Sequence, residues 1–133
     1  MKQGLKDSFS NFNSAFQSLE KSIKEDVKTE RDVAGVIKLF ELTYETCWKA
    51  MARLLSELGS PVQSPRTAFE TAFKEGLISD ESSWLKIIKD RNISVHVYDQ
   101  NEARELVKRI KDAHVSSFKG FLEVLKDKVK TLG

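Results

Sequence analysis

Three residues with chemically useful side chains, Arg91, His96 and Tyr98, stand close together in the second half of the sequence. A histidine with a pKa of about 6.5 can give or take a proton at neutral pH. An arginine carries a permanent charge on a planar fork that suits phosphate oxygens. Together they could cleave RNA without a metal. The ribose 2′-hydroxyl would attack the neighbouring phosphate, His96 would handle the proton, and Arg91 would stabilise the phosphorane. DNA lacks that hydroxyl and should be inert.

Helical geometry would keep these residues apart. Residues seven apart on an ideal α-helix lie about 20° from alignment, and residues five apart lie about 140° from each other. Arg91 and Tyr98 would therefore share a face, whereas His96 would point elsewhere. Two arrangements could reunite them. The helix could unwind near His96 as Asp99 starts the next helix, or a second copy of the chain could supply the complementary residues. The second arrangement makes a homodimer with a composite site an attractive hypothesis.

A structural role for the same residues is the alternative. A histidine near a helix end often caps the helix or packs against it. Tyr98 could be an aromatic residue at the edge of the core with its hydroxyl in water. Asp99 fits a helix cap better than a general base.

The composition indicates one soluble globular domain over residues 1–133. Hydrophobic residues make up 40% of the chain and charged residues 32%, and 22 basic against 20 acidic residues give a net charge of +2. This balance does not indicate a nucleic-acid coat protein or a membrane-surface domain. The single Cys47 excludes an intrachain disulfide and favours a reducing, cytoplasmic setting. We expect no signal peptide, because residues 1–7 contain no apolar region, and no membrane span, because no uncharged apolar run approaches the ~18 residues that a span needs.

Apolar residues recur at spacings of three and four in four long segments and one short segment, which predicts an all-α fold. The long segments cover residues 5–27, 33–58, 81–95 and 103–129, and the short one covers residues 65–76. No strand pattern is present. The brief connections favour an antiparallel four-helix bundle with an additional short helix.

Capping residues mark the expected helix ends. Thr29 with Asp32 resembles a capping box, and Asp99 with Glu102 resembles another in which Glu102 reaches back. Gly59 is expected to adopt the left-handed backbone conformation that ends the second helix, and Pro61 to prevent its continuation. Ser64-Pro65 should start the short helix, and Gly76 should end it. Ser79-Asp80-Glu81 should start the next long helix.

Several other polar residues have two interpretations. Neighbouring faces of the second helix carry residues that could line a cleft beside the motif, although Tyr44 and Trp48 also fit simple core packing: Glu41, Tyr44, Glu45, Trp48 and Lys49. Basic residues near the motif could form a rim for RNA or a solvated face: Lys86, Lys89, Arg104, Lys108 and Arg109. Arg66 could meet a phosphate, although a solvated side chain is the simpler interpretation.

The sequence predicts neither a metal site nor a cofactor. His114 lies 18 residues from His96 without ligand-like neighbours in the sequence, and Cys47 is isolated. The chain has no phosphate-binding glycine loop and no Gly-Ser signature of a nucleotidyltransferase, so we do not expect it to transfer nucleotides itself.

The central stretch resembles the HEPN superfamily (higher eukaryotes and prokaryotes nucleotide-binding). Its motif is an arginine, a polar residue, three to five more residues and a histidine, and here it reads Arg91-Asn92-Ile93-Ser94-Val95-His96. The following Val97-Tyr98 completes the Arg-x4-His-x-Tyr form typical of HepT-like toxins. The resemblance covers roughly residues 30–110, and the first and last helices match in pattern only. More narrowly, several segments resemble the branch named nucleotidyltransferase substrate-binding proteins: residues 40–49, Ser64-Pro65-Arg66, residues 69–73, Gly76-Leu77-Ile78 and Trp84.

The resemblance implies a HEPN-like bundle that dimerises and a separately encoded nucleotidyltransferase partner of the MNT type. In HepT-like systems the bundle protein is an RNase toxin, and the partner neutralises it by transferring AMP to the motif tyrosine, here Tyr98. The added phosphates and adenines beside Arg91 would fill the phosphate site and repel RNA. The implied catalytic residues are Arg91 and His96. The candidates for binding or support are Asn92, Asp99, Glu41, Tyr44, Trp48 and Lys49. The name of the branch implies an alternative, a non-catalytic subunit that binds a nucleotide or substrate for the nucleotidyltransferase.

Overall fold

The computed structural model describes residues 2–132, with side chains from residue 4 onward, and all the regular secondary structure in this part of the chain is helical. Its helices run in the order α1 (Lys2–Lys24), α2 (Glu30–Glu57), α3 (Pro65–Lys74), α4 (Glu81–Ser94), α5 (Gln100–Arg109), a π-helical turn η1 (Ile110–His114) and α6 (Val115–Leu132). The predicted all-α bundle with one additional short helix is therefore confirmed.

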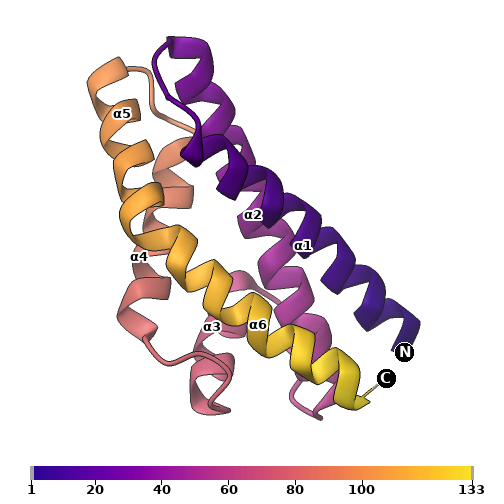
Figure 1. Ribbon diagram of the computed structural model, residues 1–133. Helices are drawn as coiled ribbons and strands as arrows, with labels where there is room; N and C mark the ends of the chain where they lie inside the picture. The colour runs from indigo at the N-terminus through magenta and orange to yellow at the C-terminus, as the bar shows by residue number, and fades with distance from the viewer. Residues whose placement is uncertain (1, 133) are drawn as a thin grey trace.

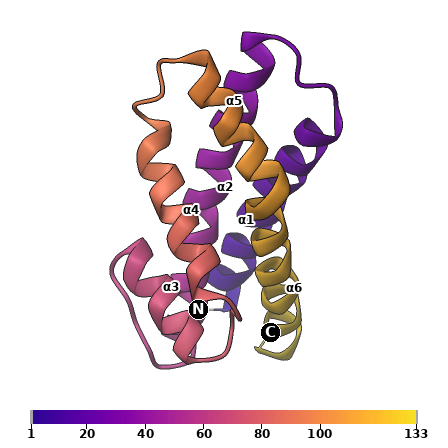
Figure 2. The same ribbon diagram turned by 90° about the vertical axis from the view of Figure 1, so that its left-hand side faces the viewer.

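The bundle is organised around α2, which contacts all the other α-helices. Helices α1 and α2 form an antiparallel pair, and α6 runs along α1 (Figure 1). The short α3 sits at one end of the bundle beside α4, and α4 runs next to α5 (Figure 2). Both termini lie at that same end in the two views. The turn between α4 and α5, which carries the motif, therefore lies at the opposite end of α4 from α3.

Aromatic side chains join the helices in the core. Phe12 of α1 contacts Phe118 and Phe121 of α6, and Trp84 of α4 meets both of these rings edge-on. Phe69 of α3 extends the cluster from Trp84, with ring centroids 4.9 Å apart. All five rings are buried, so each helix is fixed by removal of large apolar surface from water.

Most of the predicted caps are present. The hydroxyl of Thr29 accepts a bond from the backbone of Asp32, whose carboxylate accepts one from the backbone of Thr29, both at 3.0 Å. Gly59 and Gly76 have φ values of 89° and 76° and follow the ends of α2 and α3. Asp99 caps α5 as predicted, but the described structure has no return bond from Glu102, so the second capping box was wrong.

Two helix ends and one helix body differ from the prediction. Val27 was expected in the first helix but lies beyond the end of α1. Val95 was expected in the helix before the motif's turn but is the C-cap of α4. The last helix is interrupted by η1, where the N–H of Val115 bonds to the carbonyl of Ile110, five residues back. A π turn absorbs one residue more than an α-helical turn. Apolar side chains on both sides of it, Leu106 and Phe118 among them, therefore face the core, and the helix bends between α5 and α6 (Figure 1).

Within residues 2–132, no helix is both long enough and apolar enough to cross a lipid bilayer.

Candidate functional site

Arg91 lies in the last turns of α4 and faces α2. Its guanidinium carbon is 5.9 Å from the centre of the Tyr44 ring, and its Nε is buried without a hydrogen-bond partner in the described structure. Burial raises the pKa of the Tyr44 hydroxyl, and the positive charges of Arg91 and Arg66 oppose that rise. Arg66 is thus within electrostatic reach of the same ring. The Tyr44 phenol is therefore uncharged at neutral pH and lies against the guanidinium of Arg91.

The end of α4 is tied to α2 by a second polar contact. The hydroxyl of Ser94 lies 2.7 Å from the carboxylate of Glu41 and 2.7 Å from the carbonyl oxygen of Arg91. Ser94 is buried and Glu41 is half-buried. Glu41 consequently fixes the helix end that carries Arg91.

His96 and Tyr98 lie in the turn between α4 and α5. The helix ends at Ser94, and the N–H of His96 closes one last turn onto the carbonyl of Ile93 at 2.8 Å. The imidazole of His96 is exposed, and Tyr98 is 87% exposed. The unwinding near His96 considered from the sequence is therefore present, and both side chains are open to a partner molecule.

The remaining candidate residues occupy different environments. Asn92 is exposed, and Asp99 accepts bonds from the backbone N–H groups of Asn101 and Glu102, which makes it the cap of α5. Trp48 is half-buried against the core, with a buried indole N–H that has no partner among the described residues. Lys49 is exposed and pairs with Glu45 at 3.3 Å. Tyr44, Glu41 and Arg91 are therefore brought together, whereas Lys49 belongs to the solvated surface.

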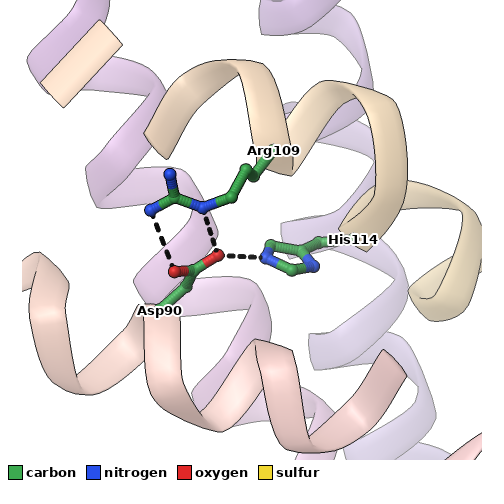
Figure 3. A network of polar contacts seen from close by, with 3 residues as sticks. All are labelled: Asp90, Arg109 and His114. Carbon is green, nitrogen blue, oxygen red and sulfur yellow. Dashed lines mark hydrogen bonds and ion pairs between the residues drawn. The ribbon is translucent and has the colours of Figure 1, made fainter. Parts of the chain in front are cut away.

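A buried polar network not anticipated from the sequence lies on another side of α4 (Figure 3). Asp90 accepts two bonds from Arg109, at 2.9 and 3.0 Å, and lies 2.6 Å from Nε2 of His114. Asp90 is 4% exposed and His114 is 3% exposed. The ring of His114 also stacks on Phe40 at 5.5 Å. His114 therefore has acidic and basic neighbours that sequence spacing did not reveal, and Arg109 is engaged in an ion pair.

Charge compensation decides the protonation of this network. Burial works against the carboxylate charge of Asp90, but hydrogen bonds from Arg109 and His114 outweigh it and hold the pKa of Asp90 below its usual range. Burial lowers the pKa of His114, and its bond to Asp90 only partly offsets that effect. Because Arg109 already neutralises Asp90, we take His114 as a neutral ring that donates its Nε2–H to the carboxylate.

One signal in the sequence could have identified His114. It lies four residues after Ile110 and four before Phe118, both of which belong to the core pattern. A histidine inside such a pattern, buried on an α-helix, needs a polar partner.

The basic rim expected from the sequence is also reduced, because Arg104 donates to the backbone carbonyl of Lys28. In the described part of the chain, no group of three or more His, Cys, Asp or Glu side chains is placed to hold a metal ion.

Comparison with known proteins gives consistent matches. Residues 7–127 match the family described as nucleotidyltransferase substrate binding protein like. A probable ribonuclease HepT of Haemophilus influenzae is 28% identical over 121 residues, which cover 79% of this chain and 83% of that protein. A solved Haemophilus influenzae structure, described as the fold of a substrate binding domain of a nucleotidyltransferase, has a TM-score of 0.79 at 28% identity. That match covers 89% of this chain and 98% of the other.

The fold also recurs in a toxin–antitoxin complex. A tri-AMPylated Shewanella oneidensis HEPN toxin, solved in complex with an MNT antitoxin, has a TM-score of 0.73 at 19% identity, over 96% of this chain and 99% of that one. The match over nearly the whole chain, added to the Arg-x4-His-x-Tyr motif at the end of α4, assigns the chain to the nucleotidyltransferase substrate-binding protein-like family, within the HEPN/HepT-like group.

Proposed function

We propose that this protein is the HepT-like component of a two-protein nucleotidyltransferase module and that it cleaves RNA without a metal ion. The observation that carries the proposal is the placement of the motif. Arg91 is held against Tyr44, while His96 and Tyr98 stand exposed in the adjoining turn. Homology to a probable ribonuclease supports this assignment. We also propose a cytoplasmic location, where such a module would meet cellular RNA.

The proposed chemistry uses only groups of the protein and the RNA. The 2′-hydroxyl loses its proton to His96 and attacks the adjacent phosphorus, the bond from phosphorus to the 5′-oxygen of the next nucleotide breaks, and that oxygen takes a proton from solvent water. The products are a 2′,3′-cyclic phosphate and a free 5′-hydroxyl. Arg91 faces the developing charge on the phosphorane oxygens with its guanidinium. Exposure of His96 gives RNA direct access to the proton-transfer group.

The proposal includes a homodimer with a composite site. Within one chain, Arg91 faces Tyr44, whereas His96 lies beyond the helix end. Leu42 and Val95 are 49% and 50% exposed, and each follows in sequence one partner of the Glu41–Ser94 bond. A second copy covering these apolar side chains would place its own motif nearby. Mixing Arg91→Lys with His96→Ala chains should then restore partial activity, because a mixed dimer contains one intact pair.

Regulation by AMP transfer follows from the position of Tyr98. Its hydroxyl is among the most accessible groups of the turn and can enter the active site of a nucleotidyltransferase. Coexpression with an MNT-type partner should increase the mass of the chain by one or more adenylyl groups, and Tyr98→Phe should remove the increase. An equal mass increase in the Tyr98→Phe chain would place the modification elsewhere.

RNA cleavage in EDTA tests the central proposal. The purified chain should cut single-stranded RNA but not DNA of the same sequence, and His96→Ala should slow cleavage by about 10²–10⁴-fold while the fold survives. Gln100→Ala, an exposed residue in the first turn of α5, is the matched control and should cut at the wild-type rate. A folded wild-type chain that leaves RNA intact, or a His96→Ala chain that cuts as fast, would refute the proposal. Growth arrest on expression should follow the same pattern.

A non-catalytic binding subunit is the second candidate. The observation that favours it is the pair of buried donors without partners in the described structure, the Nε of Arg91 and the indole N–H of Trp48. Such donors could hold a ligand without performing chemistry. This candidate predicts a stable complex with the nucleotidyltransferase and no cleavage in EDTA. It fails if the two proteins do not copurify.

A further inference from the structure

A group of cations surrounds a cavity on the side of α4 that faces α5 and η1. The cavity has a volume of about 560 Å³, and its walls include Lys86, Lys89, Arg109 and His114. Asp90 is the one carboxylate among the described lining residues, and it already accepts bonds from Arg109 and His114. With His114 neutral, three positive charges stand against one negative charge. The excess favours an anionic ligand.

Arg109 is held in place before any ligand arrives. Its Nε and Nη2 bind the two oxygens of Asp90, which is itself held by His114. The side chain of Arg109 is 45% exposed, and its Nη1 has no hydrogen-bond partner among the described residues. Figure 3 shows the third guanidinium nitrogen directed away from Asp90. A cation fixed in this way gives up little side-chain freedom when it binds an oxyanion.

The cavity reaches the C-terminal part of α4, next to the turn that carries His96. Lys89 and Ile93 are four residues apart on α4, so they lie on one face of the helix, and both line the cavity. Ile93 is partly exposed, and its carbonyl accepts the bond from the N–H of His96 that begins the turn. A strand that passes His96 can therefore continue over Ile93 toward Lys89 and Lys86. No Phe, Tyr or Trp is among the described lining residues, so the cavity offers little for a base to stack on.

We propose that this cavity binds a phosphate group of the RNA strand whose cleavage is proposed at His96. The inference rests on the proposed function and adds a substrate contact to it. Lys86 and Lys89 supply mobile charges at the rim, and Arg109 supplies the fixed fork. A free nucleotide carries the same phosphate chemistry, and the lack of a stacking ring favours the strand.

The test compares two charge-matched variants of the full chain. Lys86→Gln/Lys89→Gln removes the rim charges, and Lys126→Gln/Lys130→Gln removes two exposed lysines of α6 that form no ion pair with another described residue. Binding of a single-stranded RNA with 2′-O-methylated riboses, which cannot be cleaved by its own 2′-oxygen, is followed by fluorescence anisotropy across salt concentrations. We expect the cavity variant to bind roughly fivefold more weakly than the control variant. Its plot of log affinity against log salt should be shallower by about 0.7, the value for one single-strand phosphate.

Four outcomes are decisive. Equal affinities and equal salt slopes in the two variants overturn the cavity assignment, because the effect would be general attraction. The assignment to the strand is overturned if the cavity variant, unlike the control variant, loses affinity for AMP or inorganic phosphate but keeps its affinity for RNA. Cleavage of unmodified RNA in EDTA is measured in parallel. Cleavage without the affinity difference removes this inference alone, and the affinity difference without cleavage removes the proposed function alone.

Discussion

Asp90→Ala should destabilise the fold through the loss of three hydrogen bonds at one buried carboxylate. Asp90 is 4% exposed, and the substitution leaves His114, 3% exposed, with a ring nitrogen that has lost its partner. An unsatisfied buried polar group costs about 1–3 kcal/mol. The ion pair with Arg109 adds about 1 kcal/mol at most, because Arg109 is 45% exposed and can be rehydrated. Alanine returns about 0.5 kcal/mol of helix propensity.

The expected net loss is about 1–3 kcal/mol in the free energy of unfolding, which for a domain of this size lowers the Tm by roughly 5–10 °C. Urea titration gives the free energy, and a thermal melt followed by circular dichroism gives the Tm. Asp127→Ala, an exposed carboxylate of α6, is the matched control and should leave stability nearly unchanged. A double-mutant cycle with His114→Ala should show a coupling of about 1–2 kcal/mol between Asp90 and His114. A loss in Asp90→Ala no larger than that in Asp127→Ala, or a coupling near zero, would refute the reasoning.

Three further predictions follow from the same structure. The lowered pKa of His114 means that its contribution to stability is complete above pH 6.5 and declines as pH falls through its folded value. The lowered pKa of Asp90 extends that decline below pH 3.8. The Tm measured at pH values from 8 down to 4 should therefore fall as the pH falls. His114→Gln should make the Tm depend less on pH in the upper part of this pH range. Gly76→Ala forces a side chain into a backbone with φ of 76° and should cost about 1 kcal/mol by urea titration, with Gly35→Ala as a helical control. Burial raises the pKa of the Cys47 thiol well above its usual value, so Ellman's reagent should react with it only as fast as the chain unfolds. Rapid labelling in the native state would contradict this prediction.

The fold was largely readable from local signals. Helix ends could be predicted from single residues and their positions, because a capping hydroxyl or a positive φ depends on a few neighbouring atoms. This holds for the N-caps Thr29 and Ser64 and for the glycines after α2 and α3, Gly59 and Gly76. These features need no knowledge of which helices meet.

The Asp90 network could not be read in this way, because its three members come from different elements. Asp90 in α4 is separated by 19 residues from Arg109 and by 24 residues from His114. Their meeting depends on how α4 packs against α5 and against the π turn that contains His114. Periodicity alone counts a π turn as an imperfect α-helix and gives no sign of the extra residue. The sequence offered Tyr44 both as a residue beside the motif and as simple core packing, and only the contact between α4 and α2 shows that it lies against the half-buried Arg91.

Helix α4 is therefore fixed from two sides close to the motif. On the side of α2, the Ser94–Glu41 bond and the contact of Arg91 with Tyr44 hold its last turn. On the side of α5, Asp90 is held by Arg109 and His114. Because Asp90 directly precedes Arg91, a rotation of α4 that displaced the guanidinium from Tyr44 would also break the network. In the turn that follows, Val97 packs against the core, whereas the side chains of His96 and Tyr98 on either side of it are exposed. The rigid arginine and the accessible histidine and tyrosine thus divide the motif into a fixed half and an open half. This division suits a site that holds a phosphate firmly while its other residues meet an RNA strand or a modifying enzyme.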